Sequence, residues 1–66
     1  MKKTMDHANY PRQLRGKTED ELRYTIKDAG EAARAYPDGV NAGYYADEVS
    51  YAASELHRRA QLGARR

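Results

Sequence analysis

The chain has no cysteine and no long run of apolar residues. Without cysteine, neither a disulfide framework nor a thiolate zinc site can stabilise the fold, and a reducing compartment suits this composition. The basic start Met1-Lys2-Lys3 is not followed by an apolar stretch of seven residues, and no stretch is long enough to cross a bilayer. These absences predict a cytoplasmic protein that is neither exported nor embedded in a membrane.

Charge is distributed unevenly along the 66 residues, although the net charge is only +2. Residues 1–17 carry five basic residues against one acid, and residues 58–66 carry four arginines and no acid. The segment between them, residues 18–55, holds nine carboxylates against three basic residues. The two ends therefore form basic tails on an acidic body.

Residues 1–17 show no apolar period and contain Pro11 and Gly16, so we predict a flexible basic arm. As an alternative, Tyr10 and Leu14 dock on the helices that follow and extend their core. The capping-box pattern Thr18-Glu19-Asp20-Glu21 then predicts a helix over 18–36. Its apolar positions are spaced by four, three, four and three residues: Leu22, Ile26, Ala29, Ala33 and Tyr36.

Pro37, Asp38 and Gly39 predict a turn over 37–41, because proline ends the first helix and glycine suits a tight turn. A second helix is predicted over 42–62, with Asn41 as its N-cap and Gly63 as its stop. Its apolar stripe has a similar helical spacing, of four, three, four and four residues, and consists of Tyr45, Val49, Ala52, Leu56 and Ala60. Residues 64–66 form the basic tail.

These elements predict an all-α fold, an antiparallel two-helix hairpin over 18–63. The seam has few large aliphatic side chains: Leu22, Ile26, Val49 and Leu56. Because so thin a core is marginal at this size, we predict a homo-oligomeric helical bundle or a seam completed by another protein. The pattern leaves open whether hairpins stack side by side or the helices merge into one long rod.

No catalytic pattern stands out. Ser54 and His57 are three residues apart on the second predicted helix, but exposed pairs of this kind are common and the chain is too small to enclose a substrate. No metal-ligand spacing and no phosphate-binding loop is present. We expect no enzyme activity, no metal, no cofactor and no small-molecule substrate.

Two surfaces are candidates for binding. Tyr44 and Tyr51 are seven residues apart, so they share a face of the second helix, and with Asp47 and Glu48 they form the predicted protein-binding site. The structural alternative is that tyrosines close the thin core. The second candidate is a basic pole that grips nucleic acid, formed by Lys2, Lys3, Arg12, Arg15, Lys17, Arg58, Arg59, Arg65 and Arg66. The structural alternative is that Arg58 and Arg59 stabilise the C-terminal end of their own helix and lie near the acidic residues of the neighbouring helix.

The run P-D-G-V-N-A-G-Y-Y-A-D-E-V over residues 37–49, with E-L-H-R-R over 55–59, resembles short uncharacterised proteins encoded by tailed bacteriophages, including cyanophages. The resemblance covers residues 18–59 and carries over no functional residue. It implies a protein made inside an infected bacterium, where such small products bind and modulate a host or phage protein.

Overall fold

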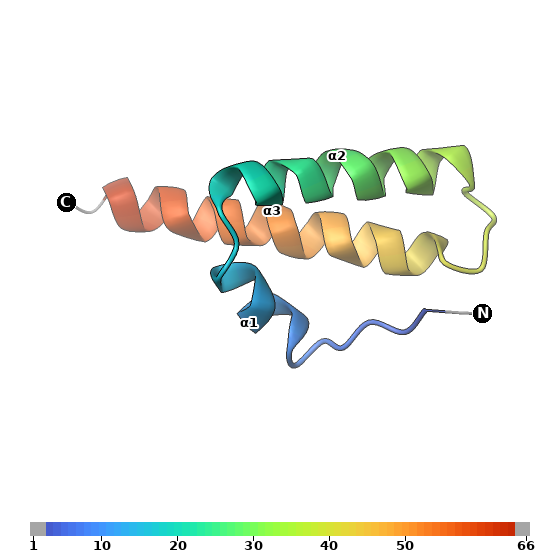
Figure 1. Cartoon of the computed structure of the whole chain (residues 1–66), viewed down its shortest axis with the longest axis horizontal. Coiled ribbons are helices and arrows are strands. Elements are labelled where there is room, and N and C mark those ends of the chain that lie inside the picture. The colour runs from blue at the N-terminus through green and yellow to red at the C-terminus, as the bar shows by residue number, and fades with distance from the viewer. Residues whose placement is uncertain (1–2, 65–66) are drawn as a thin grey trace.

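The computed structural model describes residues 3–64, and within that range the fold is all-helical with three helices (Figure 1). The helices are α1 (Tyr10–Arg15), α2 (Glu19–Ala35) and α3 (Ala42–Ala64). The molecule is elongated, measuring 43 × 23 × 15 Å. The predicted all-α class is confirmed.

The start of α2 is fixed by the predicted capping box. The Thr18 hydroxyl accepts a hydrogen bond from the Glu21 backbone N–H at 3.1 Å, and the Glu21 carboxylate accepts from the Thr18 backbone N–H at 2.8 Å. The backbone hydrogen bond lowers the pKa of the Glu21 carboxyl. Two backbone donors that the helix itself cannot satisfy are thus paired, so α2 begins within one residue of the predicted position.

The turn between α2 and α3 follows from its local sequence. Tyr36 has left the helical region at φ −133° and ψ 64°, as expected of a residue before proline. The Gly39 N–H donates to the Tyr36 carbonyl at 3.0 Å. A Cβ on Gly39 would lie 3.1 Å from that same oxygen, so this close approach favours glycine.

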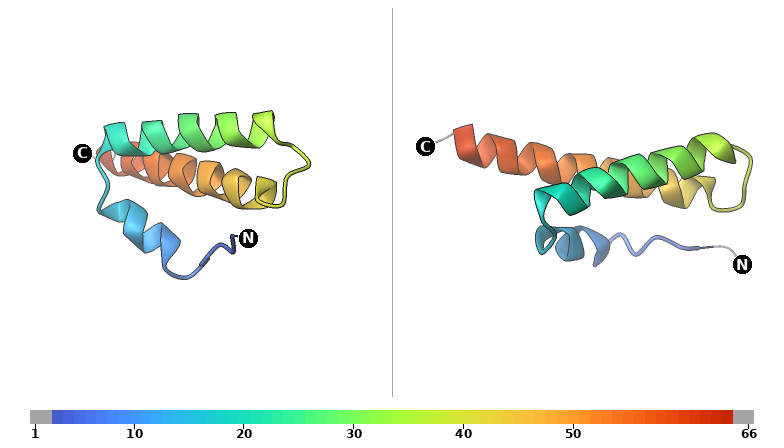
Figure 2. Two further views of the ribbon diagram at one scale, coloured as in Figure 1. Left: turned by 45° about the vertical axis from the view of Figure 1, so that its right-hand side comes forward. Right: turned by 45° about the horizontal axis from the view of Figure 1, so that its top comes forward.

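α3 runs to Ala64, two residues beyond the predicted end. Gly63, predicted to stop the helix, lies inside it, and the other two residues of the predicted tail lie outside the described range. α2 and α3 are antiparallel neighbours, and the last turns of α3 extend past α1 and the start of α2 (Figures 1 and 2).

The prediction of a flexible arm over 1–17 missed α1, and the docking alternative describes the structure better. Pro11 stands in the first turn of α1, where its missing N–H has no helical partner and its fixed φ suits a helix. Leu14 is 2% exposed and Met5 8% exposed, so both are buried by the rest of the chain. Because a six-residue helix is too short to show an apolar period, the sequence pattern did not predict α1.

The core is small and joins all three helices. Its buried centre consists of Leu14 from α1, Leu22 from α2 and Ala52 from α3. The partly buried side chains packed on this centre are Tyr10, Ile26, Tyr51 and Leu56. α1 is therefore an integral part of the core.

Candidate functional site

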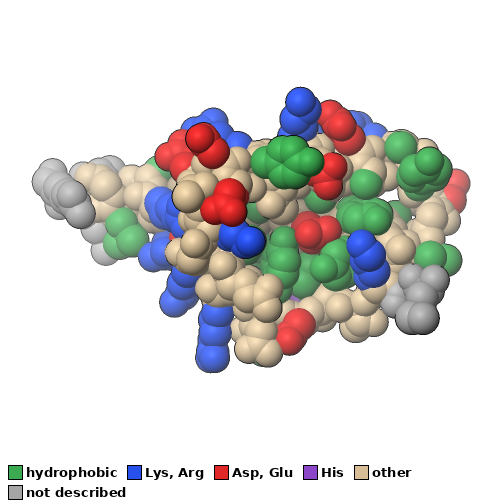
Figure 3. All heavy atoms as spheres, viewed as in Figure 1, with side chains coloured by type: hydrophobic (Ala, Val, Ile, Leu, Met, Phe, Trp, Pro, Cys, Tyr) green, Lys and Arg blue, Asp and Glu red, His purple; other side chains and the backbone are tan. Residues whose placement is uncertain are grey.

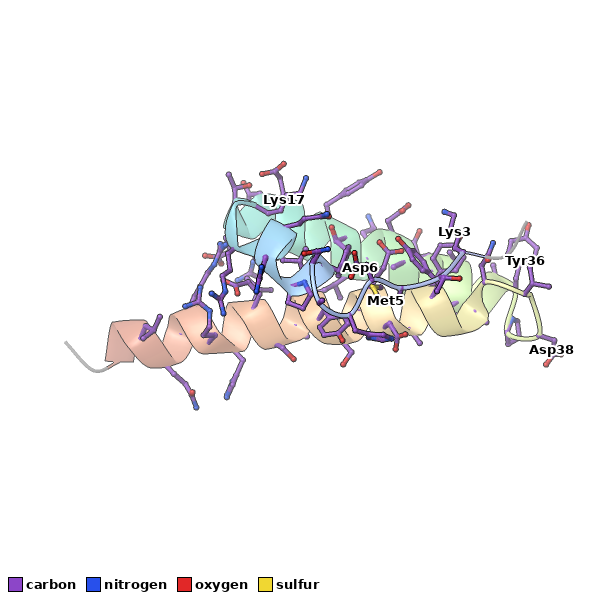
Figure 4. All side chains as sticks on the ribbon, turned by 90° about the horizontal axis from the view of Figure 1, so that it is seen from below. Lys3, Met5, Asp6, Lys17, Tyr36 and Asp38 are labelled. Carbon is purple, nitrogen blue, oxygen red and sulfur yellow. The ribbon has the colours of Figure 1, made fainter. Side chains whose placement is uncertain are left out.

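α3 is the central helix, and its sides pack against different parts of the chain. α2 packs along one side. A second side is covered by α1 and by residues 3–9, here called the N-terminal segment. In Figure 4 this segment, marked by Lys3, Met5 and Asp6, runs beside α3 toward the turn marked by Tyr36 and Asp38.

Two of the predicted protein-binding residues are held by the chain itself. The Tyr10 hydroxyl donates to Glu48 Oε2 at 3.1 Å, and His7 Nδ1 lies 2.6 Å from the Tyr51 hydroxyl. The rings of Tyr10 and Tyr51 pack at a centroid distance of 5.9 Å. Burial, followed by the nearby Glu48 carboxylate, raises the pKa of Tyr10 to about 12. Glu48 and Tyr51 therefore serve to dock α1 and the N-terminal segment.

The other two predicted residues, Tyr44 and Asp47, line a hollow of about 420 Å³ between the N-terminal segment and the first turns of α3. The remaining lining residues are Lys3, Thr4, Met5, His7, Val40 and Gly43. The Lys3 ammonium lies 5.5 Å from the Tyr44 ring centroid, within cation–π range. The structure thus divides the predicted four-residue site into a covered half and an open half.

Arg59 ties the end of α1 to α3. Its Nη2 donates to the carbonyl oxygens of Leu14 at 3.2 Å, Arg15 at 3.3 Å and Lys17 at 2.7 Å. Its Nε also donates to Glu55 at 2.8 Å. Leu14 and Arg15 are the last two residues of α1 and Lys17 follows in the linker to α2, so Arg59 caps the C-terminal end of α1 from another helix.

Glu55 is 6% exposed and is balanced by two arginines of its own helix. Arg58 donates to both of its carboxylate oxygens, at 3.0 and 2.7 Å, and Arg59 donates to one of them. The structural alternative for these arginines placed them near the acids of the neighbouring helix. In the structure their carboxylate partner is Glu55, and Glu19 pairs with Arg23 instead.

Acid is expected to remove the stabilisation that Glu55 provides. Hydrogen bonding, first from Arg58 and then from Arg59, lowers the pKa of the Glu55 carboxyl to about 2. The unfolded-state pKa is about 4.3, so this stabilisation is fully present above about pH 5 and is lost as the pH falls toward 2. Urea denaturation at several pH values should show that Glu55→Gln loses less stability over this range than the wild type. Parallel pH profiles for the two proteins would contradict this assignment.

The predicted nucleic-acid set is divided between internal and exposed roles. Arg58 and Arg59 bind Glu55, and Lys3 lies over the Tyr44 ring. Lys2, Arg65 and Arg66 lie outside the described residues. Arg12, Arg15 and Lys17 are exposed, and within residues 3–64 their side chains form no ion pair. Figure 3 shows basic side chains gathered around α1. Because Arg12, Arg15 and Lys17 are exposed, nucleic-acid binding through them stays a prediction.

The side of α3 turned away from α2 and from the N-terminal segment is exposed along its length. We call it the outward face, and it consists of Gly43, Ala46, Ser50, Ala53, Ser54, His57, Ala60 and Gln61. None of these residues is Asp, Glu, Lys or Arg. Six of them follow the alternating three- and four-residue spacing of a helix–helix seam: 43, 46, 50, 53, 57 and 60. The apolar pattern of the sequence does not indicate this face, because its members are small or polar; the available signal is the lack of charged residues at these positions.

Ser54 and His57, the candidate nucleophile and base, are both exposed on this face. Among residues 3–64, no group of three or more histidine and carboxylate side chains is arranged to hold a metal ion. Within the same residues, no helix combines the length and apolar character that a membrane span requires. No protein-family model matches the chain, and comparisons with curated proteins and with solved structures found no similar protein.

Proposed function

We propose that this chain is a non-enzymatic protein-interaction module, a helical hairpin of α2 and α3 with α1 docked on it, which works as a homo-oligomer. The observation that carries the proposal is the uncharged outward face of α3. One third of all residues in the chain are charged, yet none of the eight exposed residues of this face is. Charge is depleted at the centre of protein–protein interfaces, so this face has the composition of a contact surface.

The size of the core supports the proposal. The buried apolar side chains are Met5, Leu14, Leu22, Ala29 and Ala52. Two of these five are alanines, which contribute little apolar area. A chain of this size buries a smaller share of its surface than a larger domain does when it folds alone, and association adds burial that a monomer lacks.

The open half of the predicted tyrosine site lies beside this surface. Tyr44 and Asp47 line the hollow together with Gly43, which also belongs to the outward face. Tyrosine is favoured at interfaces because it buries a large ring and keeps a polar tip. Tyr44 and Asp47 therefore remain in the proposed contact surface, whereas Glu48 and Tyr51 are assigned to the fold.

A lysine placed in the middle of the outward face should abolish self-association. Ala53→Lys puts a charge at the centre of the contact, where it would be buried without a partner in any oligomer that uses this face. Ala35→Lys makes the same exchange at an exposed alanine of α2, and it is the matched control. Light scattering should give the monomer mass for Ala53→Lys and the oligomer mass for Ala35→Lys, with equal helicity by circular dichroism. Oligomers of equal mass for both variants would contradict the proposal.

A further inference from the structure

We propose that a second copy of this chain covers the outward face, with the two α3 helices antiparallel. In this arrangement Gly43 lies opposite Ala60 of the second copy, Ala46 opposite His57, and Ser50 opposite Ala53. The inference rests on the proposed function and names the partner and the register. Three features of α3 support it: the spacing of the outward face, the glycine at position 43, and the charges in the two halves of the helix.

The spacing along α3 fits one straight helix partner. Residues that alternate by three and four stay on one side of a helix for its whole length, which is the pattern of a left-handed helix pair. From Gly43 to Ala60 the seam covers 18 residues, or about 27 Å at 1.5 Å per residue. Every proposed layer contains at least one Gly, Ala or Ser, so the two backbones can approach to the lower end of the usual 8–10 Å.

Gly43, in the first turn of α3, leaves space for a second helix. Nothing lies within 4 Å of the position that a Cβ on Gly43 would take, and the same holds for Gly63 near the other end of the helix. Gly30 differs, because its Cβ would contact Val49 across the α2–α3 seam at 3.9 Å. A second helix that packs against Gly43 would use the space that the missing side chain leaves, and it would also close one side of the hollow of about 420 Å³.

The charges of α3 favour the antiparallel orientation. The first half of the helix carries Asp47 and Glu48 and no basic residue, whereas the second half carries Arg58 and Arg59. Both arginines bind Glu55, the one acid of the second half, so this half keeps a net positive charge. An antiparallel pair places Asp47 of each copy near the Arg58–Glu55 pair of the other, at the net positive half, and a parallel pair would bring acid to acid. Charge complementarity therefore selects a second copy in this orientation.

The contact is small, because its side chains are short and its length is that of one helix. Interfaces at the low end of the size range form weak, transient complexes. We therefore expect a dimer that dissociates on dilution, so the test has to be made on concentrated protein.

Disulfide trapping tests the register directly, since the chain contains no cysteine of its own. Full-length Ala46→Cys and His57→Cys are oxidised separately and as an equal mixture. In the antiparallel pair, position 46 meets position 57 of the other copy, while two identical positions lie about 16 Å apart, too far for a disulfide. The mixture should form a cross-linked dimer of the two variants, and neither variant alone should do so. Ala35→Cys, at an exposed site outside the outward face, is the control for random oxidation and should stay uncross-linked.

Two results would overturn the inference. Cross-linking of each single variant with itself would show a parallel pair. No cross-link in the mixture, from a wild-type protein whose solution mass is that of an oligomer, would show that another face is used. Neither result would remove the proposed function, which fails separately if the wild-type chain stays monomeric at every concentration.

Discussion

Replacing Leu22 with alanine is expected to remove a large part of the stability of the fold. Leu22 is fully buried and belongs to the centre of the core with Leu14 and Ala52. Truncation of a buried leucine costs about 2–5 kcal/mol, because apolar contacts are lost and a cavity remains. A chain of 66 residues has a free energy of unfolding of roughly 3–10 kcal/mol, at about 0.05–0.15 kcal/mol per residue. The substitution therefore removes much of the total stability.

Urea denaturation followed by circular dichroism measures this loss. Val40→Ala is the matched control, since Val40 is an apolar residue in the turn and is 71% exposed. Its expected effect is within about 0.5 kcal/mol, as for most surface substitutions. A Leu22→Ala protein that keeps nearly all of the wild-type stability would show that this core does not hold the fold together.

Replacing Arg59 with methionine is expected to detach α1 from α3. The substitution keeps an unbranched apolar side chain and removes the guanidinium that bonds two carbonyls at the end of α1 and the Lys17 carbonyl in the linker after it. It also takes one of two ion-pair partners from the nearly buried Glu55. Hydrogen bonds that involve a charged group are worth about 1.5–3 kcal/mol, so we expect a loss of about 2–3 kcal/mol.

Limited proteolysis provides a second readout for Arg59→Met, because a detached α1 exposes the chain around residues 16–18 to cleavage. Arg58→Met is the control. Arg58 bonds the same carboxylate, and no hydrogen bond joins it to α1 among the described residues. Faster cleavage is expected for Arg59→Met alone. Equal cleavage of both variants would mean that α1 is held mainly by Leu14 and Tyr10.

The sequence predicted the elements whose signals are local. The capping box at Thr18 and the proline at position 37 act on their immediate neighbours, and α2 lies within one residue of its predicted ends. Gly63 misled the prediction of the end of α3, because a glycine near a helix end is tolerated inside it when no other stop signal follows. Pro11 led to the opposite error, a helix that was not predicted. A proline breaks a helix interior but is favourable in a first turn, where Pro11 stands in α1.

The divided tyrosine site required the tertiary structure. Tyr10 and Glu48 are 38 residues apart in sequence, and His7 and Tyr51 are 44 apart. Periodicity along one helix places Tyr44 and Tyr51 on a shared face, but it contains no information on which part of that face a distant segment covers. Arg59 illustrates the same limit, because two of its three carbonyl partners belong to a helix that the pattern did not predict.

The account assigns one side of α3 to each of three tasks. α2 and the α1 region cover two sides with the aliphatic and aromatic side chains of the core. The third side is the outward face, where small or polar residues stand in place of the large apolar residues of a core, and Asp, Glu, Lys and Arg are absent. The central claim is that this third side is a contact surface between copies.

Backbone amide chemical shifts of the wild-type chain, recorded by NMR over a dilution series, test that claim most directly. The account predicts concentration-dependent shifts centred on Gly43, Ala46, Ser50, Ala53 and His57, with the exposed side of α2 unchanged. Shifts that are centred on α2 or on the turn at Tyr36 and Val40, or spectra that do not change with concentration, would contradict it.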